Sequence, residues 1–181
     1  AAMAKARVEA VVVQDDTVFG EANAGEIAAL DAVISFARNA DAPRSTHETN
    51  LITVLILSLK QHTKEPNIVW RVAMAYSLVS AFSGDIAFDV AKTGAHTILI
   101  ENYALYKKQG NHLVQQQILW FFGSLLMWPP SKKVVNKQQE CMDFFKMILQ
   151  DFEDLKAKMA ADPASKKKVS SLSLQNKLFA F

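Results

Sequence analysis

The sequence contains a single cysteine, Cys141, among its 181 residues. One thiol excludes an intramolecular disulfide and any zinc site built from several cysteines, and it fits a reducing compartment. The chain also lacks an Asn-x-Ser/Thr glycosylation sequon. Neither sign of charge is in marked excess, since the formal net charge is +2, whereas nucleic-acid binding usually requires a strongly basic face. We therefore expect an intracellular protein with no nucleic-acid partner.

Long apolar runs are missing as well. The lowest-polarity stretch, residues 118–130, is too short to cross a bilayer and ends in a tryptophan and two prolines. The N-terminus has no apolar signal core followed by a cleavage site, and it has no initiator methionine, as in a processed or excised form of a longer protein. We expect a soluble, cytoplasmic protein, with an organelle such as the mitochondrion, after removal of a presequence, as the alternative.

The residue patterns of common enzyme sites are also missing. Residues 20–25 have the glycine spacing of a phosphate loop, but Glu26 and Ile27 stand where lysine and serine or threonine are needed. Cys141 has no neighbouring histidine or asparagine motif. The histidines show no i, i+4 pairing of the kind that holds zinc; they are His47, His62, His96 and His112. The sequence therefore predicts no catalytic residue, cofactor, metal or small-molecule substrate.

Apolar residues recur at helical spacing through most of the chain. The predicted helices are 5–13, 26–38, 51–59, 68–82, 86–92, 96–108, 113–128, 131–138 and 141–159. The first contains a run of valines and could equally form a short strand. The segment 51–59 is apolar enough to be buried on most sides. The side chains expected to cap helix starts are Asn50, Asn67, Asp85 and Ser131. A Lys- and Ser-rich tail then divides the chain into a helical domain, 1–159, and a tail, 160–181.

Two of the predicted helices, 68–82 and 113–128, are versions of one another 46 positions apart. That shift places apolar residues on apolar residues at every core position: Ile68 on Val114, Val72 on Ile118, Ala75 on Phe121, Tyr76 on Phe122 and Val79 on Leu125. Similar shifts relate 98–103 to 144–149 and 72–79 to 27–34. A helical repeat of this length is typical of an α-solenoid, whose units bury their apolar faces only against neighbouring units.

One unit resembles an armadillo repeat. Residues 90–95 (VAKTGA) match the turn of small residues and glycine between that family's first two helices. Residues 114–126 (VQQQILWFFGSLL) are similar to its third helix, which reads Val-x-x-x-Ala-x-Trp-Ala-Leu-x-Asn-Leu. The resemblance is good over 67–128, fair over 26–67 and 131–152, and absent in the tail. It implies an all-α protein, a right-handed α-solenoid of about three to four armadillo-like repeats.

The resemblance also implies where a partner would bind. In armadillo proteins the third helices line a concave groove, in which a tryptophan and an asparagine one turn later clamp an extended peptide backbone. The corresponding positions here are Arg71, Met74, Leu78, Gln117, Trp120 and Ser124. Only Trp120 keeps the family's residue, and Ser124 stands in place of the asparagine. This departure argues against importin-alpha-like capture of basic nuclear-localisation peptides. The plainer interpretation of Trp120, beside two phenylalanines, is a core residue.

The sequence thus predicts a module for protein–protein interaction, a structural or adaptor subunit of a larger multiprotein assembly. The alternative is a transport or signalling adaptor that binds a short peptide motif in the groove through Arg71, Gln117 and Trp120. A short solenoid has two open ends that expose apolar surface unless something covers them. We therefore expect protein partners within a complex.

Overall fold

The computed structural model describes residues 23–38 and 50–161, with side chains up to residue 157. Within these ranges the regular secondary structure is entirely α-helical, apart from a single 3₁₀ position at Asn23, so the all-α prediction is confirmed there. The helices are α2 (Ala24–Ala37), α4 (Leu51–Gln61), α5 (Pro66–Phe82), α6 (Gly84–Lys92), α7 (Ala95–Lys108), α8 (His112–Leu126), α9 (Pro129–Val135) and α10 (Gln139–Ala161). The helix predicted at 5–13 and nearly all of the predicted tail lie outside the described residues. In the described part of the chain, no helix is both long and apolar enough to cross a bilayer.

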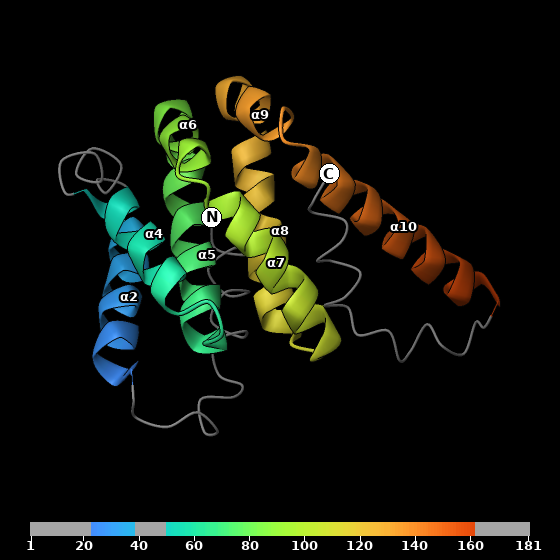
Figure 1. The fold of residues 1–181 in the computed structure, drawn as a ribbon, viewed down its shortest axis with the longest axis horizontal. Helices are drawn as coiled ribbons and strands as arrows, with labels where there is room; N and C mark the ends of the chain where they lie inside the picture. The colour runs from blue at the N-terminus through green and yellow to red at the C-terminus, as the bar shows by residue number, and fades with distance from the viewer. Residues whose placement is uncertain (1–22, 39–49, 162–181) are drawn as a thin grey trace.

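The packing partners of the helices recur at a fixed interval along the chain (Figure 1). Helix α5 packs most extensively against α8, and on its other side against α2. Likewise α6 packs against α9, while α7 packs against both α4 and α10. Each of these contacts joins helices whose labels differ by three. Helices that occupy the same place in successive groups of three therefore pack against one another.

Helix α5 lies at the centre of the fold and is buried around most of its circumference. Twelve of its 17 residues are buried. A chain of aromatic rings extends from it across the structure: the ring centroids of Tyr76 and Phe121 are 5.8 Å apart, and those of Phe121 and Phe122 are 5.2 Å apart. Phe122 and Phe144 follow at 4.9 Å, and Tyr103 meets Phe144 edge-on at 5.1 Å. These contacts connect α5, α8, α10 and α7 in one core.

The starts of α5 and α6 correct two predicted caps. Helix α5 begins at Pro66, with Glu65 as its N-cap residue, so Asn67 lies inside the first turn and does not cap. Proline suits the first helical position because its φ is already helical and the missing N–H would have no partner there. At α6, Ser83 is the N-cap and accepts a hydrogen bond from the backbone N–H of Asp85 at 3.3 Å. The predicted N-cap residue, Asp85, therefore lies two positions after the actual one.

The starts of α4 and α9 correct the other two. Asn50 occupies the N-cap position of α4, but it adopts a left-handed conformation (φ 52°) and its side chain makes no capping bond. Helix α9 begins at Pro129, so Ser131 lies inside it. The hydroxyl of Ser131 instead donates to the carbonyl oxygens of Leu125 and Trp128, the latter at 3.0 Å. This serine joins the end of α8 to the start of α9.

Helix α4 is less buried than its sequence predicts. Val54 and Leu57 are 56% and 58% exposed. The helix packs against α5 and α7, and its buried residues, Leu51, Leu55, Ile56, Ser58 and Leu59, do not enclose its circumference. The prediction of burial on most sides is therefore wrong, because apolar density along a sequence does not say how many neighbours a helix has.

Candidate binding surface

The six residues predicted to line a groove come from the two helices that pack most extensively. Arg71, Met74 and Leu78 belong to α5, and the remaining three belong to α8. Residues three and four positions apart lie on the same face of a helix, so each set of three shares one face. Helices α5 and α8 lie against one another. We call this set of six residues, with the face of α5 and α8 that carries them, the ladder surface.

Most of the ladder surface is buried. Arg71 and Met74 are each 5% exposed, Gln117 is 2% exposed and Ser124 is 7% exposed. Leu78 is partly exposed and packs against the hydrophobic core. Within this set, therefore, Leu78 and Trp120 are the side chains with appreciable accessible area, and the other four would contact a ligand only over small areas.

Trp120 differs from the other two tryptophans in its surroundings. Trp70 belongs to the buried core, and Trp128 is partly buried and packs against that core. Trp128 is fixed further by a hydrogen bond from its Nε1 to the carbonyl oxygen of Ser80 at 2.8 Å. Trp120 is partly exposed and, among the described residues, it neither belongs to the hydrophobic core nor packs against it. The interpretation of Trp120 as a core residue is not supported by this placement.

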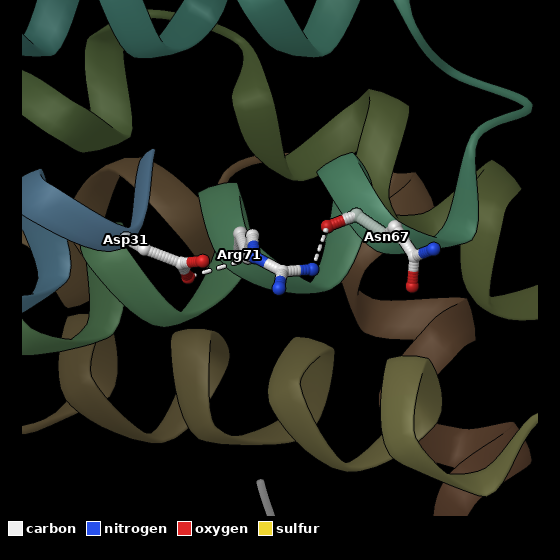
Figure 2. A network of polar contacts seen from close by, with 3 residues as sticks. All are labelled: Asp31, Asn67 and Arg71. Atoms are coloured by element: carbon white, nitrogen blue, oxygen red, sulfur yellow. Dashed lines mark hydrogen bonds and ion pairs between the residues drawn. The ribbon is translucent and has the colours of Figure 1, made fainter. Parts of the chain in front are cut away.

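Arg71 joins α5 to α2 (Figure 2). Its Nε lies 2.8 Å from Oδ1 of Asp31. Its Nη1 donates a hydrogen bond to the carbonyl oxygen of Asn67, with 3.0 Å between the nitrogen and the oxygen. The guanidinium carbon also lies 4.2 Å from the centre of the Trp70 ring, within the range of a cation–π contact. The side chain of Arg71 is 6% exposed, whereas that of Asp31 is 50% exposed. Arg71 thus contributes to the α2–α5 interface, with a carboxylate at the surface beside it.

A second set of polar contacts fixes α2 from another direction. Glu26, in the first turn of α2, accepts a hydrogen bond from the hydroxyl of Ser58 in α4. Its other carboxylate oxygen lies 2.7 Å from Nε2 of His62, which follows α4. The sequence gives no local sign of these polar contacts of α2, because the partners lie 32 to 40 positions apart.

The polar groups of α8 bear on the peptide-clamp idea. Ser124 stands where the armadillo pattern has asparagine, and its hydroxyl donates to the carbonyl oxygen of Phe121, at 2.8 Å, in the same helix. The side-chain oxygen of Gln117 is buried and has no hydrogen-bond partner among the described residues. A buried amide oxygen without a partner is costly, so a ligand that donated to it would be favoured. Such a ligand would have to displace the atoms that now cover this oxygen.

Burial suppresses ionisation of the thiol and phenol groups in the core. Burial raises the pKa of the Cys141 thiol to about 11, so it carries little of the thiolate that makes a cysteine reactive. Burial also raises the pKa of Tyr106 to about 12, and those of Tyr76 and Tyr103 further. Over residues 23–38 and 50–157, no group of three or more His, Cys, Asp or Glu side chains could hold a metal ion.

Comparison with known proteins found no match: no family model, no curated protein and no solved structure is significantly similar to this chain. Function must therefore be argued from the geometry of the ladder surface and of the helices that carry it.

Proposed function

We propose that this chain is a protein–protein interaction module: an armadillo-like, right-handed α-solenoid of about three to four repeats that serves as a structural or adaptor subunit of a larger assembly. The regular succession of helix contacts supports the solenoid part of this proposal, since α2, α5 and α8 form one row of neighbours. Helices α4, α7 and α10 form a second row, and α6 and α9 a third. Rows of equivalent helices are what stacked repeats produce.

The placement of Trp120 carries the binding part of the proposal. A tryptophan that is partly exposed and, within the described residues, lies outside the hydrophobic core is poorly explained by folding stability. Tryptophan is enriched among the few residues that dominate the energetics of protein interfaces. Trp120 lies on α8, which packs extensively against α5. A partner that contacted Trp120 would therefore meet a well-packed pair of helices. Trp120 would be the anchor of the contact.

A folded or helical partner fits this surface better than a clamped, extended peptide. Peptide clamping needs several regularly spaced polar side chains that are free to bond a backbone. Here the Ser124 hydroxyl donates within its own helix and Arg71 is engaged with Asp31. The polar residues of the ladder surface are also nearly inaccessible. An apolar contact centred on Trp120 and Leu78 needs no such ladder.

The test compares two single substitutions in the tagged full chain, expressed in cells of its own organism. Trp120→Ala should lose a stoichiometric partner, because removing an interface anchor costs about 2 kcal/mol, roughly thirtyfold in affinity. Met127→Ala is the matched control, since Met127 also lies at α8 and is 63% exposed. It should keep the partner. Crosslinks from the partner should map to α8.

Two results would contradict the proposal. If Trp120→Ala lowers the thermal stability as strongly as Trp70→Ala does, the ring is a structural residue and the anchor is lost. If Trp120→Ala folds normally and retains every partner of the unsubstituted chain, the ladder surface is not the interface. Size-exclusion chromatography of the isolated chain bears on the subunit role, because a clean, stable monomer would argue against permanent membership of a complex.

A further inference from the structure

A hollow lies between helices α6 and α9, on a part of the surface that shares no residue with the ladder surface. Its volume is about 450 Å³, and its lining is Phe88, Pro129, Pro130, Lys133, Val134 and Lys137. The two helices pack against one another, and Figure 1 shows them side by side at the upper edge of the molecule. The hollow therefore has rigid walls and an opening to solvent.

The lining has an apolar floor and a cationic rim. Phe88 and Val134 are partly buried, and the ring of Phe88 is held under the ammonium group of Lys92, 3.8 Å from the ring centre. Lys133 and Lys137 are exposed at the rim, four positions apart. The volume, about 450 Å³, would accommodate one or two large side chains.

The charge at this edge is net positive. Residues 84–93 and 129–138 contain four lysines and two aspartates. One aspartate, Asp89, lies 3.4 Å from Lys92. Lys133 and Lys137 form no ion pair with any described residue. Two uncompensated cations beside an apolar hollow are an arrangement complementary to carboxylates that flank an apolar side chain.

We propose that the α6–α9 hollow docks an acidic segment of a partner protein, with an aromatic or leucine side chain in the hollow and carboxylates on Lys133 and Lys137. This goes beyond the proposed role of the ladder surface and does not depend on it. A nucleic acid would use the lysines but would leave the floor of Phe88 and Val134 without a partner. The apolar floor is the reason for choosing a peptide.

The experiment selects ligands with the full-length chain and a display library of random short peptides. Peptides that bind should be enriched in an aromatic residue or leucine flanked by Asp or Glu. The double substitution Lys133→Glu/Lys137→Glu should weaken the enriched peptides by about tenfold or more, since both rim charges turn repulsive. Lys132→Glu is the matched control, because Lys132 is an exposed lysine of α9 that does not line the hollow. It should change affinity by no more than about twofold.

Several outcomes would overturn the inference, provided circular dichroism shows that the variants are folded. These are a failure to enrich any such peptide, an equal loss with Lys132→Glu, and unchanged binding when the apolar residue of the peptide is replaced by serine. The last would reduce the site to a non-specific cationic patch. Displacement of the peptide by a short oligonucleotide at matched concentration would point to nucleic acid instead. Concentration-dependent dimerisation abolished by Lys133→Glu/Lys137→Glu would make the occupant a second copy of this chain.

Discussion

The ion pair between Arg71 and Asp31 should be a measurable part of what attaches α2 to the rest of the fold. The perturbation is a double-mutant cycle of Arg71→Met, Asp31→Ala and the two combined. Methionine keeps the apolar stem of the arginine and removes the guanidinium. Because Arg71→Met also removes the hydrogen bond to Asn67 and the contact with Trp70, the single substitution overstates the value of the ion pair. The cycle isolates the pairwise part.

The magnitude follows from the geometry. Two unit charges at the 2.8 Å separation of Nε and Oδ1 attract by about 6 kcal/mol at an effective dielectric constant of about 20. Desolvation of the buried guanidinium offsets much of this. Water also screens Asp31, whose side chain is half exposed. We expect a coupling free energy of about 1–2 kcal/mol, above that of a surface pair and below that of a fully buried one.

Urea unfolding followed by circular dichroism gives the coupling free energy, and hydrogen exchange locates it. Because α2 packs chiefly on α5, exchange should rise in the amides of α2 more than in those of α8. Lys156 and Glu153 provide the control, as an exposed pair within α10 at 3.9 Å that should show no resolvable coupling. A coupling below about 0.5 kcal/mol for Arg71 and Asp31, or unchanged exchange in α2, would refute the reasoning.

Two further predictions concern single side chains. Burial lowers the pKa of His96 below its usual value of about 6.5, and Glu140 opposes the shift more weakly. As the pH falls, the unfolded chain therefore binds a proton at this histidine before the folded chain does. The contribution of His96 to stability should be complete above about pH 6.5 and decrease below it. Urea midpoints measured from about pH 7.5 to pH 5.5 should fall less steeply in His96→Gln, and parallel curves would contradict this. At Gly84, a Cβ would lie 3.2 Å from the Trp128 ring, whereas one at Gly25 would meet nothing within 4 Å; Gly84→Ala should therefore lower stability by about 1 kcal/mol and Gly25→Ala should raise it by a few tenths. Thermal unfolding compares them, and an equal effect would show that the ring moves aside freely.

The helices could be predicted because they depend on local pattern. Apolar residues at three- and four-residue spacing located seven of the described helices to within two residues at each end, and α9 to within three. The shift of 46 positions correctly paired residues of α5 and α8 that occupy equivalent core places, such as Val72 and Ile118, both fully buried. The buried core positions of α8 follow those of α5 at the same shift.

Helix starts were predicted less well, since several residue types compete for the same few positions. Asn67, Asp85 and Ser131 are all suitable caps in isolation. Pro66 and Pro129 precede two of them and start the helix earlier, and Ser83 precedes the third. A proline at the first position is a strong start signal, and giving it priority would have located α5 and α9 correctly.

The burial of the three tryptophans could not be predicted from local sequence. Each lies in an apolar helical segment or beside one, and the local pattern favoured a core position for Trp120. Their different surroundings come from other helices: Trp128 reaches back to Ser80 at the end of α5, 48 positions away, while Trp120 has no comparable place in the core formed by the described residues. The exposed fraction of a side chain depends on how many neighbouring rows of helices cover it. Trp120 is a binding candidate because no neighbouring helix of the described chain buries its ring. A partner that buried this ring would pack on α8 as α8 packs on α5.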